Sequence, residues 1–376
     1  MIYLDNPATS MQKPSVVYDA MYRNTVRYSV NAGRGGHWAS IAGAEGIAEA
    51  QEELAGLFNI TNPERIAFTQ NATYALNMAI GGILKPGDHA IITSMEHNSV
   101  LRPVHRICSY TMVQANQAGE INPADIERAI RKNTRLVITT HASNVCGTIM
   151  PVRKIGEICR KYSIPYLVDS AQTAGIIPID AEAMNISLLA FSGHKGLMGP
   201  LGTGGLYVRE GIKLNPVIVG GTGTESKNKN QPDSMPDMLH SGTLNTPAIM
   251  TLSTAVKYIR NIGIENIDRK ERFLAQKLFE GLMNIKGVTV YGLATGNRNG
   301  TVAFNIGDMD SQEAADILNR KFGIATRGGY HCSYIAHRSI GSEKSGAVRI
   351  GFGLFSTKAE AEKLLFAVNK IAADSR

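Results

Sequence analysis

A lysine and an aspartate follow two neighbouring strand-like stretches in the middle of the chain. Tyr166–Asp169 is a short apolar run that ends in a carboxylate, and Ile186–Phe191 leads through Ser192-Gly193-His194 to Lys195. Pyridoxal 5′-phosphate (PLP) needs an amine for its aldehyde and a carboxylate for its ring nitrogen. A lone lysine before a glycine-rich loop is more often a surface residue, and Asp169 alone could equally cap a helix. Together the two motifs favour a PLP site, with Lys195 bonded to the cofactor.

A helix that begins after a strand end supplies the expected phosphate site. The segment Thr69-Gln70-Asn71-Ala72-Thr73 joins a strand-like stretch to a helix-like one. The free N–H groups at a helix N-terminus and its positive dipole end attract a phosphate. Gln172, three residues after Asp169, is a candidate donor to the phenolate oxygen of PLP, unless it is an ordinary surface glutamine. The expected phosphate ligands are Ala72, Thr73, Ser192 and His194.

A cysteine near the end of the chain is a candidate nucleophile. Cys332 follows Arg327-Gly328-Gly329-Tyr330-His331 and precedes Ser333. Most free cysteines are buried and inert, but the glycines and the serine favour an exposed loop here. A reactive thiol must be accessible and partly ionised, and Arg327 and His331 are placed to favour the thiolate.

The order of the elements predicts an α/β fold. Strand-like stretches at residues 65–69, 89–93, 135–139, 166–169 and 186–191 alternate with helix-like stretches at 74–84, 100–110 and 123–131. Such alternation predicts a mostly parallel sheet flanked by helices, with ligands beyond the carboxyl ends of its strands. The candidate residues fall at those ends. The Gly/Pro-rich stretch at 220–237 predicts a mobile loop.

After residue 245 the pattern changes. One long helical stretch over 246–283 is followed by strands at 288–291, 301–304 and 348–350, and by helices at 311–322 and from 358. We therefore expect two domains: a large PLP-binding α/β domain over residues 14–245 and a small α+β domain over residues 246–376. The small domain would carry the Cys332 loop.

These motifs resemble those of the class V, fold-type-I aminotransferase family, and most closely its cysteine desulfurase and selenocysteine lyase branch. The resemblance is carried by Asp169-Ser170-Ala171-Gln172, Ser192-Gly193-His194-Lys195 and the Cys332 segment, and covers nearly the whole chain. The short interval between Arg327 and Cys332 resembles group II desulfurases. The segment departs from the pattern in lacking a paired histidine before Cys332 and a proline soon after it. The family fold would also place part of residues 1–30, with a helix from about Pro14, in the small domain.

The resemblance implies roles for further residues. His97 would stack on the PLP ring and take part in proton transfer, although a buried histidine with satisfied hydrogen bonds is the commoner case. Thr243 would reach the phosphate from the partner subunit of a homodimer. The residues implied for the substrate carboxylate are Arg349 and Asn144, and those implied for the entrance of the site are Arg34 and His37.

Cys332 decides which activity the resemblance implies. Its thiolate would take the sulfur of L-cysteine as a persulfide and leave L-alanine. The alternatives are a selenocysteine lyase, a class V aminotransferase or lyase in which Cys332 is incidental, and a catalytically silent binding protein. A sulfur-acceptor protein is an expected partner. The destination of the sulfur, whether iron–sulfur cluster assembly or another pathway, stays open.

The bulk composition excludes several other classes. The 376 residues carry 39 Lys and Arg against 32 Asp and Glu, but the basic residues are scattered, so we expect no nucleic-acid partner. No apolar run is long enough to span a membrane, and the first residues do not form a secretory signal. The four cysteines show no metal-binding spacing, so we expect no metal and a cytoplasmic location.

Overall fold

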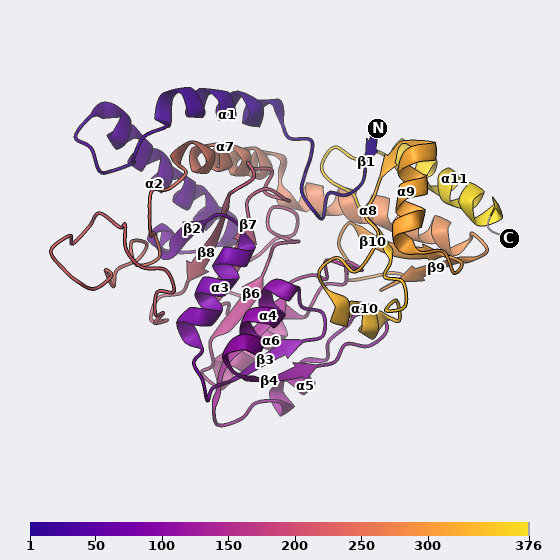
Figure 1. Ribbon diagram of the computed structural model, residues 1–376, viewed down its shortest axis with the longest axis horizontal. Coiled ribbons are helices and arrows are strands. Elements are labelled where there is room, and N and C mark those ends of the chain that lie inside the picture. The colour runs from indigo at the N-terminus through magenta and orange to yellow at the C-terminus, as the bar shows by residue number, and fades with distance from the viewer. Residues whose placement is uncertain (375–376) are drawn as a thin grey trace.

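A seven-stranded sheet forms the centre of the computed structural model, which describes residues 1–374 (Figure 1). The strand order is β2-β8-β7-β6-β5-β3-β4, and β8 runs in the direction opposite to the other six of these strands. The predicted α/β fold with a mostly parallel sheet is therefore confirmed. The strands are β2 (Ile66–Thr69), β3 (His89–Thr93), β4 (Ser109–Val113), β5 (Thr134–Thr140), β6 (Tyr166–Asp169), β7 (Leu188–Ser192) and β8 (Gly204–Val208).

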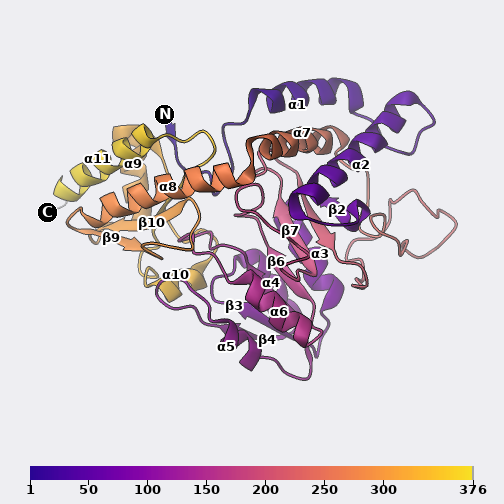
Figure 2. The same ribbon diagram turned by 180° about the vertical axis from the view of Figure 1, so that it is seen from behind.

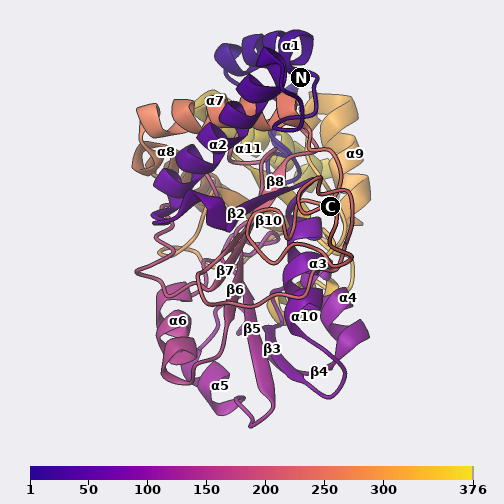
Figure 3. The ribbon, with the colours of Figure 1, turned by 90° about the vertical axis from the view of Figure 1, so that its left-hand side faces the viewer.

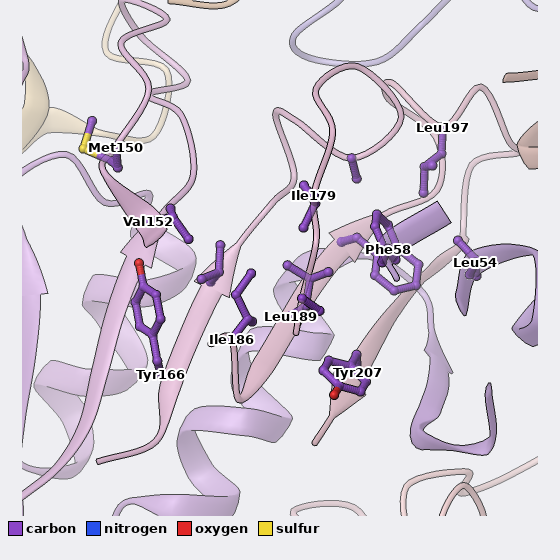
Figure 4. Close-up of a cluster of buried hydrophobic side chains, with 14 of the residues drawn as sticks. Leu54, Phe58, Met150, Val152, Tyr166, Ile179, Ile186, Leu189, Leu197 and Tyr207 are labelled. Carbon is purple, nitrogen blue, oxygen red and sulfur yellow. The ribbon is translucent and has the colours of Figure 1, made fainter. Parts of the chain in front are cut away.

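Helices cover both faces of this sheet, as Figure 3 shows from the side. Successive residues of β7 point to opposite faces: Leu188 and Ala190 belong to one apolar cluster, whereas Leu189 and Phe191 belong to another. Strands buried on both faces are continuous apolar runs, which is why they were recognisable in the sequence. The first cluster includes α3 (Ala72–Ile83) and α4 (Asn98–Ile107). The second, drawn in Figure 4, includes α2 (Trp38–Phe58), α6 (Val152–Lys161) and α7 (Thr246–Ile262).

A smaller antiparallel sheet lies at the other end of the molecule (Figure 2). Its order is β12-β10-β9, and it shares an apolar cluster with α8, α9 and α11. A two-stranded parallel sheet joins β1 to β11. The elements of this region are β1 (Ile2–Tyr3), α8 (Ile264–Met283), β9 (Val288–Tyr291), β10 (Thr301–Ile306), α9 (Ser311–Phe322), β11 (Ile324–Ala325), α10 (Tyr334–Ile340), β12 (Val348–Gly351) and α11 (Lys358–Asp374).

The structure differs from the sequence prediction in two elements. The helical stretch over 246–283 is two helices, because Gly263 adopts a φ of 86° that ends α7 before α8 begins. The helix predicted over 100–110 ends at Ile107, and Ser109 already begins the edge strand β4. The remaining elements are α1 (Ser15–Tyr28), which packs against α7, η1 (Pro63–Arg65) and α5 (Pro123–Arg128).

A long loop over residues 209–245 connects β8 to α7 and extends away from the sheet in Figure 1. It brings its last residues back to the start of α7, whose N-cap is Asn245. Within residues 1–374, no helix combines the length and apolarity that crossing a membrane requires.

Candidate active site

A cavity of about 170 Å³ opens at the carboxyl ends of β2, β3, β5, β6 and β7. These ends share one edge because the five strands run in the same direction. Nine residues predicted from the sequence line this one cavity, although they span more than 120 positions. They are Ala72, Thr73, His97, Asn144, Asp169, Gln172, Ser192, His194 and Lys195.

Lys195 and Asp169 are electrostatically coupled in the wall of this cavity. Burial lowers the pKa of Lys195 to about 8, while the negative charge of Asp169 acts in the opposite direction. Burial likewise raises the pKa of Asp169, against the Ala171 N–H bond and the charge of Lys195. An amine with a pKa near 8 is partly neutral at pH 7, as a nucleophilic lysine requires. A lysine of this kind can react as a nucleophile when it is neutral, and the buried carboxylate lies close enough to influence its charge.

The Ser-Gly-His-Lys segment follows β7 in a tight turn. A Cβ atom on Gly193 would lie 2.2 Å from the Thr203 hydroxyl, so only glycine fits there. This close approach brings Ser192 to the start of α3, where its Oγ accepts a hydrogen bond from the Ala72 N–H at 3.2 Å. The N-terminus of α3 and the Ser192 hydroxyl thus face the same end of the cavity, a donor set suited to phosphate.

Hydrogen bonds through Ser99 connect His97 to Thr73, at the end of the cavity where α3 begins. The Nδ1 atom of His97 accepts from the Ser99 N–H at 3.0 Å, and the Ser99 hydroxyl lies 2.8 Å from the Thr73 hydroxyl. Because Nδ1 is an acceptor, the proton of the neutral ring lies on Nε2. Burial lowers the pKa of His97 to about 4, with the charge of Lys195 as the second cause, so the ring is neutral at pH 7.

The side chain of Arg349, on β12 of the small sheet, contacts the segment that follows β5 of the large sheet. Its Nη1 donates to the Asn144 carbonyl at 3.0 Å, and its Nη2 donates to Asp5 Oδ1 at 2.8 Å. Two of the five guanidinium N–H groups are therefore engaged, and Nε has no partner within the described residues. The side chain is only 2% exposed, so its ion pair with Asp5 is not a surface salt bridge.

Cys332 is the exposed cysteine of the four, whereas Cys146 and Cys159 are buried and Cys108 is half-buried. Its carbonyl accepts from the Asn98 N–H at 2.8 Å, next to the cavity-lining His97. The loop is thus exposed at Cys332, as the sequence predicted.

The neighbours of Cys332 are arranged differently from the expectation. Ser333 is buried, and its Oγ donates to Asn144 Oδ1 at 2.8 Å, while Asn144 Nδ2 donates to the His331 carbonyl at 2.8 Å. The His331 ring is also buried, and burial lowers its pKa to about 2, ahead of the charge of Arg349. A neutral His331 cannot favour the thiolate by its charge, so that part of the prediction is wrong.

Five predicted residues do not line the Lys195 cavity of their own chain: Arg349 and Cys332, described above, and three that lie farther away. Thr243 lines a separate cavity of about 360 Å³, and Arg34 lines another of about 410 Å³ formed with residues of the 209–245 loop. His37 is the N-cap of α2, and its side chain accepts from the Ser40 N–H. The roles expected for these three residues stay predictions.

The sequence did not single out Asp5, Ser99 or His337, which contact predicted site residues in the structure. An aspartate directly after a strand-like start was the only signal for Asp5. Nothing in the sequence pairs Asp5 with an arginine 344 positions away. Within the described part of the chain, no group of three or more His, Cys, Asp or Glu side chains could hold a metal ion.

Comparison with known proteins gives one consistent family. The model of the aminotransferase class-V family matches residues 2–364. A probable cysteine desulfurase from Methanothermobacter thermautotrophicus is 33% identical over 382 residues, which cover 99% of this chain and 94% of that protein. A second, from Halalkalibacterium halodurans, is 32% identical and covers 98% of this chain and 93% of its own length. The solved cysteine desulfurase structure from Thermococcus onnurineus is 30% identical, with a TM-score of 0.92 over 99% of this chain and 95% of that one.

Proposed function

We propose that this chain, which belongs to the aminotransferase class-V family, is a PLP-dependent cysteine desulfurase that converts L-cysteine to L-alanine and takes up the sulfur on Cys332. The relatives named as cysteine desulfurases match it over nearly their whole length. One structural observation carries the proposal. The exposed Cys332 accepts a hydrogen bond through its carbonyl from Asn98, the residue after the cavity-lining His97, which supports a thiol close to the lysine-containing cavity.

The residues of the cavity fit PLP. Ala72, Thr73 and Ser192 would hold its phosphate, and Lys195 would bind its aldehyde. A buried carboxylate such as Asp169 is costly unless it is paired, and the protonated ring nitrogen of PLP would provide that partner. When bound, PLP supplies an electron sink for the negative charge that develops on the substrate carbon.

The protein's own groups then divide the remaining work. Arg349 would bind the substrate carboxylate through its free N–H groups, beside the Asn144 amide. Lys195 would accept the substrate Cα proton, since its lowered pKa leaves part of the amine neutral. The Cys332 thiolate would attack the substrate sulfur: the bond between Cβ and sulfur breaks with its electron pair left on the substrate, and a sulfur–sulfur bond forms on Cys332. Cβ then gains a proton and Lys195 returns the proton to Cα, which gives alanine.

The exposed position of Cys332 supports a protein as the next acceptor of the sulfur. A persulfide at this place is accessible from solvent, and Tyr330 and Tyr334 on either side are also exposed. We therefore include a sulfur-acceptor protein among the partners. All four cysteines are free, which fits a reducing compartment such as the cytoplasm.

We also propose a homodimer in which Thr243 completes the phosphate site of the partner. Within one chain Thr243 lies outside the Lys195 cavity, on a loop that extends from the body (Figure 1). Exposed apolar side chains gather on α1, the start of α2 and the same loop, a composition typical of an interface. They include Tyr18, Tyr22, Val26, Trp38, Ile41, Val217, Ile218 and Val219.

Incubation of the purified holoenzyme with L-cysteine and with L-selenocysteine tests the proposed activity. We expect alanine from both, and a persulfide on Cys332 after one turnover with L-cysteine, detected by alkylation and mass spectrometry. Cys332→Ala should retain the PLP spectrum but lose alanine release from L-cysteine. Wild-type rates for Cys332→Ala on L-cysteine would instead indicate an aminotransferase or another lyase. Alanine from L-selenocysteine alone would indicate a selenocysteine lyase.

A further inference from the structure

Two buried histidine rings stack against each other next to the Cys332 turn. His331 precedes the cysteine, and His337 comes from α10, which follows it. Their ring centroids are 5.4 Å apart with an interplanar angle of 20°, and they are 3% and 0% exposed. The sequence departed from its family pattern in lacking a paired histidine before Cys332; in the folded chain His331 has a histidine partner from the next helix.

The hydrogen bonds of this pair have a single consistent direction. His331 Nε2 lies 3.1 Å from the Arg327 carbonyl, which can only accept, so Nε2 carries the ring proton. Nδ1 of the neutral His331 must then accept from His337 Nε2 at 3.2 Å. His337 Nδ1 in turn accepts from the Ser342 hydroxyl at 2.7 Å. His331 must be neutral for this chain of three bonds to exist, and a neutral His337 completes it with the Ser342 hydroxyl as donor.

The electrostatics agree with neutral rings. Burial lowers the pKa of His337 to about 4, although a backbone hydrogen bond with Tyr330 opposes the shift. The pKa of His331 is lowered further by burial and by the positive charges of Arg349 and Arg327. Neither imidazole is therefore suited to exchange protons with a substrate at neutral pH. A catalytic acid or base at His337 is further disfavoured because both of its ring nitrogens already have partners.

The pair is attached to an unusual backbone turn. His331 and Cys332 adopt φ angles of 51° and 59°, a left-handed conformation that non-glycine residues rarely adopt, least of all in succession. Such a conformation persists only where its surroundings fix it. Asn144 and Asn98 bond to the two carbonyls of this turn, and the His331 ring is the side-chain contact that secures it from the interior.

We propose that His337 is a positioning residue for the desulfurase reaction: by donating to His331, it fixes the left-handed turn that presents the Cys332 thiol to the substrate. This inference rests on the proposed function, because positioning a thiol matters only where the thiol reacts. Nucleophilic attack requires a near-contact geometry, so a small displacement of the turn slows the reaction considerably. The role differs from simple packing, which would affect stability but not the thiol.

Two substitutions separate these roles. His337→Phe preserves an aromatic ring in the stack but removes both hydrogen bonds, whereas His337→Gln retains an N–H donor towards His331. For the phenylalanine variant we expect kcat with L-cysteine to fall about five- to tenfold. This is the effect of losing one hydrogen bond, the one to His331 that fixes the turn. KM should stay within about twofold, because the group that binds the carboxylate, Arg349, is unchanged. The glutamine variant should recover most of the loss.

A second readout needs no turnover. The rate at which iodoacetamide alkylates Cys332, measured by mass spectrometry with Cys108 as the internal reference, should change in the phenylalanine variant and return in the glutamine variant. Because the alkylation rate does not depend on desulfurase activity, it tests the positioning role separately from the proposed function. If the wild-type protein forms no alanine, the proposed function is refuted, but the alkylation rates still test whether His337 positions Cys332.

Control variants complete the design. His105→Phe changes an exposed histidine of α4 that also contacts a tyrosine ring, and should match wild type in every measurement. Ser342→Ala removes only the outermost bond and should show a smaller effect of the same kind, which keeps the test available if His337→Phe does not fold. A lowered melting temperature with wild-type kcat and alkylation, or a glutamine variant as impaired as the phenylalanine one, would overturn the proposal.

Discussion

Replacing Arg349 by lysine is expected to lower kcat/KM for L-cysteine by about 10- to 100-fold. The guanidinium already donates to Asp5 at 2.8 Å and to the Asn144 carbonyl at 3.0 Å, and only its remaining N–H groups can reach a substrate. A lysine ammonium has three donors on one atom and cannot span these partners together with a carboxylate. The loss corresponds to one charged hydrogen bond, about 1.5 to 3 kcal/mol.

Steady-state kinetics with L-cysteine measure this effect, and most of it should lie in KM. Cysteamine, which has the amine and thiol of cysteine but no carboxylate, is the matched ligand. Its spectral titration of the bound cofactor should give the same affinity in wild type and in Arg349→Lys. Asp5→Asn is the matched protein control, because it keeps the guanidinium and removes only its charged partner. Equal KM values for L-cysteine in Arg349→Lys and wild type, with both proteins folded by circular dichroism, would refute the assignment of Arg349 to the carboxylate.

Two further predictions concern assembly and pH. Thr243→Ala should weaken retention of PLP during dialysis without separating the subunits, and a stable monomer with full PLP occupancy would contradict the shared site. The free energy of unfolding should fall as the pH decreases from about 6.5 towards 4, because buried histidines with a lowered pKa bind protons only in the unfolded chain. Each such histidine lowers it by up to about 1.4 kcal/mol per pH unit. Two buried glutamates with a raised pKa have the opposite effect on the free energy of unfolding, but the histidines outnumber them. A melting temperature that stays constant or rises below pH 6.5 would refute the predicted loss of stability. The histidines are His89, His141, His240, His331 and His337, and the glutamates are Glu96 and Glu271.

The central strands and the residues at their ends could be predicted from the sequence. β3 and β6 match the predicted ranges because both faces of each strand are buried, which makes most of their residues apolar. The edge strand β4 could not be recognised in this way. Its residues from Ser109 to Met112 are half-buried or exposed, so they lack a continuous apolar signal, and the first two were predicted as the end of a helix.

The contacts between distant residues could not be predicted. The φ angle of a single glycine inside a helical pattern cannot be read from the sequence, so the break between α7 and α8 at Gly263 could not be predicted. The Asp5–Arg349 ion pair and the His331–His337 stack depend on how the small sheet and α10 pack, which only the folded chain determines. Motif residues on one sheet edge were predictable, whereas the residues that orient them were not.

The pairing of β1 with β11 sets the order in which a newly synthesised chain can complete this enzyme. The N–H of Leu4 donates to the Ala325 carbonyl, and the Leu4 carbonyl accepts from the Gly351 N–H. Leu4 can therefore form these hydrogen bonds only after Ala325 and Gly351 have been synthesised. A nascent chain can form the seven-stranded sheet, and with it the cofactor cavity, before Asp5 meets Arg349. Arg349, the group proposed to bind the substrate, is thus the last part of the site to be assembled, and a substitution that weakens the β1–β11 pairing would interfere with this final step rather than with cofactor binding.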